Sequence, residues 1–158
     1  MLAPRFVVDT MLGRLARWLR AMGYDTLYPG QAEDRRLLQL ARAEERILVT
    51  RDRMLARLGQ PHSCLIRGER VDDQIVEAVE QLALAPDERD WLSRCLECNG
   101  TLERGAPESL PGHVPEHVLA LHTEFTRCPG CARIYWAGSH ADRMKERLSR
   151  LLGTGRSE

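Results

Sequence analysis

Lysine is nearly missing from this 158-residue sequence: Lys145 is the only one among 23 basic residues, and the others are arginines. This shortage disfavours any active site that needs a lysine, because the first 140 residues contain none. Basic and acidic residues balance at 23 each, so the chain has no net charge with which to coat nucleic acid as histones do. Binding to nucleic acid would have to come from a local patch of arginines, whose guanidinium groups hold phosphate through paired N–H groups.

Long apolar segments are missing as well. No stretch approaches the roughly 18 consecutive apolar residues of a membrane-spanning helix. The first eight residues pass from Met-Leu-Ala-Pro-Arg into a short apolar run, without the apolar core of a signal peptide. We therefore expect a cytoplasmic protein with no membrane partner. The five cysteines fit this expectation, because in a reducing compartment closely spaced cysteines bind metal more often than they form disulfides.

Apolar residues in the first 84 positions recur at strand spacing and at helix spacing in turn. Strands are predicted at residues 6–8, 24–28, 47–50 and 63–66. Helices are predicted at residues 11–22, 34–45, 54–58 and 72–82. Strands that alternate with helices in this way predict an α/β fold, in which a small parallel sheet of βαβ units is flanked by helices.

Acidic residues follow the predicted strands at one end. Asp9 and Asp52 come directly after strands, and Asp34 begins the helix after the second strand. Asp72 and Asp73 begin the helix after the fourth strand. Because parallel strands all end at the same edge, these carboxylates converge where open α/β sheets bind ligands. A single Asp here is typical of a helix N-cap, but several carboxylates together need a cation, and Mg²⁺ or Mn²⁺ suits oxygen ligands.

Four of the five cysteines form two CxxC pairs. Cys95 and Cys98 make the first pair, and Cys128 and Cys131 make the second after 29 intervening residues. Two such pairs bind zinc as thiolates in a closed tetrahedral site, which leaves no open position for catalysis. A redox role is disfavoured, because redox CxxC pairs usually occur singly beside a βαβ unit. We predict a structural zinc site whose removal unfolds the C-terminal part without directly touching the acidic residues.

Aromatic residues make up only 5% of the chain, and two of them lie just after the second cysteine pair. Trp136 is followed by His140 and Arg143 at the start of a predicted helix. Such aromatic and basic side chains favour stacking on single-stranded RNA. The alternative is that Trp136 packs the helix onto the zinc-binding part, and the sequence leaves both possibilities open.

Segments in the same order over nearly the whole chain resemble one known family. In the first half they are Val8–Arg20, Gly23–Asp25, Asp34 and Ile47–Asp52. In the second half they are Arg94–Gly100, Cys128–Cys131 and Tyr135–His140. These segments resemble the PIN-like ribonuclease module named after the C-terminal domain of the Mut-seven exoribonuclease.

The resemblance implies a PIN fold in which acidic residues at the edge of a small parallel sheet bind divalent metal and cleave RNA. Carried over by position, the catalytic residues would be Asp9, Asp34, Asp52 and Asp73. Asp72 competes with Asp73 for the fourth place, because no distinctive motif surrounds either one.

The resemblance also implies two parts and an RNA-binding surface. Residues 1–88 would form the PIN-like nuclease domain, and residues 89–158 would form a Cys₄ zinc-ribbon subdomain with a C-terminal helix. Arg14, Arg17, Arg20 and Arg51 could hold phosphates beside the acidic residues, and Arg51 is favoured because it adjoins Asp52. The alternative is that these arginines only face solvent, as exposed arginines on helices usually do. The zinc ribbon would aid RNA binding.

The predicted function is therefore a ribonuclease that hydrolyses RNA phosphodiester bonds with Mg²⁺ or Mn²⁺. The alternative is an RNA-binding or regulatory PIN-like protein with little or no turnover. A phosphatase is disfavoured, because its signature needs a second acid two residues after Asp9, where this chain has Met11. The sequence does not distinguish single-stranded from structured RNA or endonucleolytic from exonucleolytic action, and it is silent on oligomeric state.

Overall fold

The computed structural model describes residues 2–153, and its first half has the predicted α/β fold. Four parallel strands form one sheet in the order β2-β1-β3-β4. They are β1 (Phe6–Val8), β2 (Thr26–Leu27), β3 (Ile47–Thr50) and β4 (Ser63–Leu65). Val8 lies opposite Val49, so β1 and β3 end side by side in the middle of the sheet.

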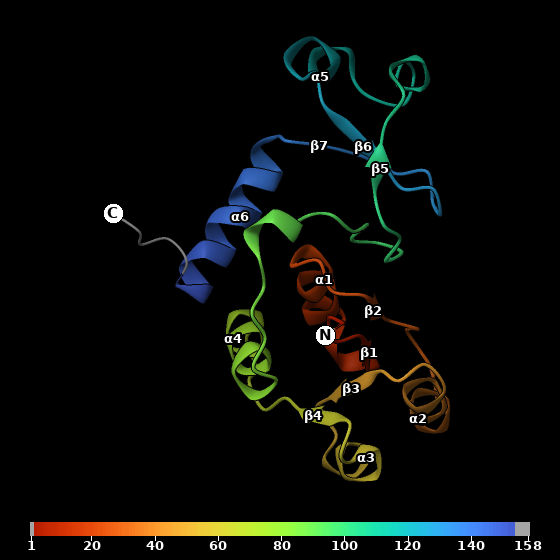
Figure 1. Cartoon of the computed structure of the whole chain (residues 1–158), viewed down its shortest axis with the longest axis vertical. Coiled ribbons are helices and arrows are strands. Elements are labelled where there is room, and N and C mark those ends of the chain that lie inside the picture. Colours follow the sequence, from red (N-terminus) through yellow and green to blue (C-terminus); the bar gives the residue numbers. More distant parts are fainter. Residues whose placement is uncertain (1, 154–158) are drawn as a thin grey trace.

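Helices cover both faces of this sheet (Figure 1). They are α1 (Gly13–Ala21), α2 (Asp34–Ala43), α3 (Arg53–Gly59) and α4 (Val71–Gln81). Alternate residues of β1 point to opposite faces, as strand geometry requires. Phe6 and Val8 join the hydrophobic cluster of α1 and α4, whereas Val7 joins the cluster of α2 and α3. Each helix begins near the carboxyl end of a strand, so the helix N-termini and the acidic residues share one edge.

The second half contains a small antiparallel sheet. Its strands, in the order β5-β6-β7, are β5 (Glu103–Arg104), β6 (Phe125–Arg127) and β7 (Ile134–Trp136). The helices of this half are α5 (Glu116–Leu121) and α6 (Ser139–Leu152). Short 3₁₀ turns lie at Thr10–Leu12, Glu88–Asp90 and Pro107–Ser109. None of the helices within residues 2–153 is long and apolar enough to cross a membrane.

The two halves share one hydrophobic core. Figure 1 shows α6 returning from the small sheet to lie beside α4. Met144 and Leu148 of α6, together with Trp91 and Leu96, belong to the same buried cluster as Phe6. The division at residue 88 therefore stays a prediction, because apolar packing continues across it.

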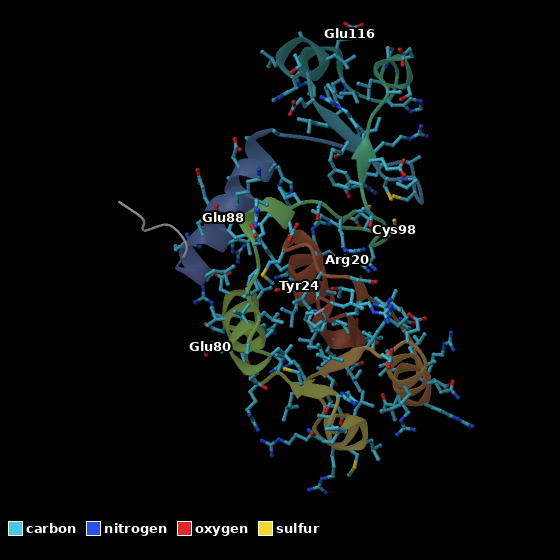
Figure 2. All side chains as sticks on the ribbon, in the orientation of Figure 1. Arg20, Tyr24, Glu80, Glu88, Cys98 and Glu116 are labelled. Atoms are coloured by element: carbon cyan, nitrogen blue, oxygen red, sulfur yellow. The ribbon has the colours of Figure 1, made fainter. Side chains whose placement is uncertain are left out.

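A buried arginine joins α1 to the first cysteine pair. Arg20 is 6% exposed, and its guanidinium donates to the Thr26 carbonyl at 2.9 Å. The same side chain donates to the carbonyls of Leu96 and Glu97 at 3.0 and 3.1 Å. Figure 2 shows Arg20 just below Cys98, where the first half of the chain meets the cysteine loop. An arginine buried to this extent needs these acceptors, so the loop completes the environment of α1.

An asparagine in the same loop closes the free edge of the parallel sheet. The Asn99 side-chain oxygen accepts from the Thr26 N–H at 2.8 Å, and its amide group donates to Asp25 at 2.7 Å. Asp25 also pairs with the buried Arg46 at 2.7 Å, and these hydrogen bonds lower the pKa of Asp25 although its burial alone would raise it. β2 is thus held from one side by β1 and from the other by the cysteine loop.

Candidate active site and cysteine cluster

Two predicted catalytic acids are joined through a threonine hydroxyl. Asp9 follows β1 and is 8% exposed, whereas Asp52 follows β3 and is exposed to solvent. Between them, the buried Thr50 hydroxyl donates to Asp9 Oδ2 at 2.7 Å and accepts from the Asp52 N–H at 3.0 Å. Asp9 Oδ1 also accepts from the Thr10 N–H at 2.7 Å. The neighbouring strands therefore present Asp9 and Asp52 together at the edge of the sheet.

Asp52 is also the N-cap of α3. Its Oδ1 accepts from the Leu55 N–H at 2.9 Å, which satisfies one of the free amides at the start of that helix. Its second carboxylate oxygen makes no hydrogen bond among the described residues. Asp52 can therefore act as a helix cap and still offer an oxygen to a ligand.

The other predicted acids lie further along the same edge. Asp34 is the first residue of α2, the helix that connects β2 to β3, and is exposed. Asp72 and Asp73 lie in the first turn of α4. Asp72 forms an ion pair with Arg147 at 2.5 Å, whereas Asp73 is exposed and makes no ion pair within residues 2–153. We call this row of acids, Asp9, Asp34, Asp52, Asp72 and Asp73, the acidic edge.

The carboxylates of the acidic edge are not gathered into one compact group of metal ligands. Within the described part of the chain, only the cysteines form a group of three or more possible metal ligands whose ligand atoms all lie within 4.8 Å of one another. Mg²⁺ usually keeps several waters and takes only one or two carboxylates from the protein, with substrate phosphates completing its shell. Asp9 and Asp52 supply a ligand set of that size and chemical type.

Thr50 is the member of this site that the sequence analysis missed. The signal that could have identified it is a polar residue at the end of an otherwise apolar strand. Thr50→Val keeps the shape of the side chain but removes the hydroxyl, so Asp9 loses a donor. If the edge holds a catalytic ion, we expect metal-dependent RNA cleavage to fall by about 10- to 100-fold, as is typical when a group that orients a metal ligand is lost.

The stability cost of Thr50→Val should be smaller, about 1–2 kcal/mol, because one buried hydrogen-bond partner is removed. Cleavage rates and urea unfolding of the same preparations measure the two effects separately. Thr50→Ser is the matched control, since it keeps the hydroxyl and should retain most of the activity. Equal rates for Thr50→Val and the unsubstituted chain would remove Thr50 from the site.

The four cysteines come together as predicted. Cys95 and Cys98 precede β5, while Cys128 and Cys131 lie in the connection between β6 and β7. The sulfur of Cys95 lies 3.6 Å from that of Cys131, and the sulfur of Cys98 lies 3.2 Å from that of Cys128. A Zn–S bond of 2.3 Å places tetrahedral sulfurs about 3.8 Å apart. This group of four thiols has the size and chemistry to hold zinc.

The surroundings of Cys95 favour its negatively charged thiolate form. Burial raises the pKa of the Cys95 thiol, but hydrogen bonds from Tyr135 and from the backbone N–H groups of Cys98 and Glu97 bring it down to about 6. The Tyr135 hydroxyl lies 3.2 Å from the Cys95 sulfur. Since zinc binds the thiolate, this environment favours the ligating form of Cys95.

Two of the predicted RNA-binding arginines lie beside the acidic edge. Arg14 and Arg51 line a cavity of about 610 Å³. Arg70, which precedes α4, and Arg147, from α6, line the same cavity. We call this cavity, bounded by the four arginines, the basic cleft.

The remaining predicted RNA-binding residues lie elsewhere. Arg17 forms an ion pair with Glu97 and does not line the basic cleft. Trp136 and His140 line a second cavity of about 440 Å³, mostly apolar in character, between the small sheet and α6. Trp136 is half-buried and packs within the small sheet, while Arg143 is exposed on α6 and lines neither cavity. The structure thus separates the predicted RNA contacts into two regions.

Comparison with known proteins gives one match. A family model described as the Mut7-C RNAse domain matches residues 4–148. The matched range contains the acidic edge, the basic cleft and all four cysteines. No match is found among curated proteins or among solved structures.

Proposed function

Because this chain belongs to the Mut7-C RNAse domain family, we propose that it is a metal-dependent ribonuclease that hydrolyses RNA phosphodiester bonds at its acidic edge. The family points to a ribonuclease-type role, and the four clustered cysteines could hold zinc. The observation that carries the finer proposal is the pairing of Asp9 and Asp52 through the Thr50 hydroxyl. The Thr50 hydroxyl fixes the Asp9 carboxylate and the backbone of Asp52 at the ends of adjacent strands, which supports a divalent-ion site between them.

Asp9 and Asp52 would hold Mg²⁺ or Mn²⁺. Asp34 and Asp73 stay candidates for the catalytic set, but neither joins Asp9 and Asp52 in a compact group of ligand atoms among the described residues. When bound, such an ion acts as a Lewis acid that acidifies water and offsets negative charge on the phosphodiester. The residues of the chain have separate tasks in this scheme. Thr50 holds Asp9 in place, Asp52 keeps an oxygen turned to solvent while it caps α3, and nearby arginines bind phosphates of the RNA.

The cysteine cluster has a structural role in this proposal. A Cys₄ zinc site has no open position for substrate, so it contributes stability and not chemistry. The side chains of Trp136, His140 and Arg143 would assist with RNA at a second region, away from the acidic edge. The proposed cytoplasmic location rests on the close grouping of four cysteines, which suits metal binding in a reducing compartment.

The proposal is tested by incubating the purified chain with single-stranded and hairpin RNAs and adding Mg²⁺, Mn²⁺ or neither. Cleavage is expected only with an added divalent ion. EDTA would also strip zinc, so the control without Mg²⁺ or Mn²⁺ uses metal-depleted buffer, and the zinc content is measured throughout. RNA that is bound under all conditions but never cut would instead identify an RNA-binding protein without turnover.

A further inference from the structure

The basic cleft is built from both halves of the chain. Arg14 comes from α1, Arg51 from the connection between β3 and α3, and Arg70 from the residue before α4. Arg147 comes from α6, which belongs to the second half. The lining of the cleft contains four guanidinium groups and two carboxylates, so the cleft carries net positive charge. The C-terminal helix therefore completes a cavity beside the acidic edge.

Arg147 is held in a fixed position. Its Nε donates to Asp72 at 2.7 Å, and its guanidinium lies over the ring of Trp18 at 5.1 Å from the ring centre. These contacts occupy part of the guanidinium, which has five N–H donors. The ion pair is partly open to solvent, and such pairs contribute little to stability. A pre-oriented arginine with unused donors is suited to bind an anion.

The start of α4 contributes a further arginine to the cleft. Arg70 is the N-cap of α4, but its side chain cannot cap the free amides of that helix, and no side-chain cap is present. Asp72 and Asp73 in the first turn of α4 offset the partial positive charge of the helix start, so the positive charge of the cleft comes from its arginines. Among the residues that the structure describes, Arg14 and Arg70 form no ion pair. Their charges remain available to a ligand.

We propose that the basic cleft binds phosphate groups of the RNA strand, and that Arg70 and Arg147 contact the substrate together with Arg14 and Arg51. The inference rests on the proposed ribonuclease function, which it deepens by giving α6 a direct part in substrate binding. Arg51 is the neighbour of Asp52, and Met11 and Gly13 of the lining follow Asp9 closely. A strand whose phosphates occupy the cleft would thus pass directly onto the acidic edge.

The test measures RNA binding separately from cleavage. In a chain that carries Asp52→Asn, affinity for a fluorescein-labelled oligouridine is followed by anisotropy at several salt concentrations. Arg70→Gln and Arg147→Gln should each weaken binding about tenfold, because each removes charged hydrogen bonds to phosphate. The slope of log affinity against log salt should fall by about 0.7 for each phosphate of the single strand that the variant no longer neutralises.

Arg57→Gln is the matched control, because Arg57 is an exposed arginine in the last turn of α3, at the opposite edge of the sheet. It should leave both affinity and salt slope unchanged. Arg147→Gln also removes the contacts to Asp72 and Trp18, so its folding is checked by thermal unfolding. Arg70→Gln decides the question even if Arg147→Gln does not fold, since the Arg70 side chain makes no ion pair in the described part of the chain.

Wild-type affinity and salt slope in Arg70→Gln would overturn the assignment of the cleft. The experiment distinguishes failure of the proposed phosphate binding in the cleft from failure of the proposed ribonuclease activity. Metal-dependent cleavage together with unaffected binding in Arg70→Gln would remove only the cleft. Loss of RNA binding in Arg70→Gln, with no cleavage by the unsubstituted chain, would remove only the ribonuclease proposal.

Discussion

Asparagine in place of Asp52 is expected to lower metal-dependent RNA cleavage at least about 100-fold, because the loss of a metal ligand should exceed the effect of losing a group that only orients one. The substitution replaces a charged oxygen by a neutral amide. It keeps the acceptor for the Leu55 N–H, and asparagine is as good an N-cap as aspartate. The free energy of unfolding should therefore change by less than about 1 kcal/mol.

The experiment compares initial rates of cleavage by the two proteins, purified in parallel, in the presence of Mn²⁺. Asp87→Asn is the matched control, because Asp87 also caps a helical turn, accepting from the Arg89 N–H at 2.9 Å, and lies outside the acidic edge. Asp87→Asn should cleave at the unsubstituted rate. An unchanged rate in Asp52→Asn would show that Asp52 is a helix cap only, and that any nuclease in the preparation is a contaminant or uses other residues.

If the cysteine cluster holds zinc, Cys95→Ser is expected to destabilise the whole chain and not only its second half. Zinc contributes about 10–16 kcal/mol to the folding of small zinc-binding domains. If the cysteine loop loosens, Arg20 loses its acceptors at Leu96 and Glu97, and Thr26 loses its acceptor on Asn99. Each unsatisfied buried group costs about 1–3 kcal/mol. These contacts reach α1 and β2 but not the acidic edge, so the expectation that zinc removal does not touch the acidic residues directly stays a prediction.

A loss of about 3–5 kcal/mol would lower the melting temperature of the 158-residue chain by about 6–20 °C. Zinc content, circular dichroism and amide hydrogen exchange at Thr26 measure the effect, and exchange at Thr26 should become fast. Cys64→Ser is the control, since Cys64 is buried in the core outside the cluster and its substitution should leave the zinc content intact. Normal protection of β2 in Cys95→Ser would instead establish that the halves fold independently at the predicted boundary.

Local patterns in the sequence predicted most of the fold. The apolar runs at residues 6–8 and 47–50 became β1 and β3 at the predicted positions, because strand periodicity depends on neighbouring residues. The predicted parallel sheet brought Asp9 and Asp52 to one edge, since parallel strands share their direction. The spacing of the CxxC pairs predicted the cysteine cluster, which reflects a requirement of zinc chemistry and not of the fold.

The tertiary structure alone decided which of these groups touch. Thr50 reaches Asp9 across 41 residues, Arg147 reaches Asp72 across 75, and Asn99 reaches Thr26 across 73. Such contacts depend on how helices and loops pack, and no local periodicity encodes them. The sequence by itself therefore determined the elements, the acidic residues and the zinc ligands. Packing between the halves decided that α6 completes the basic cleft and that the cysteine loop supports the parallel sheet.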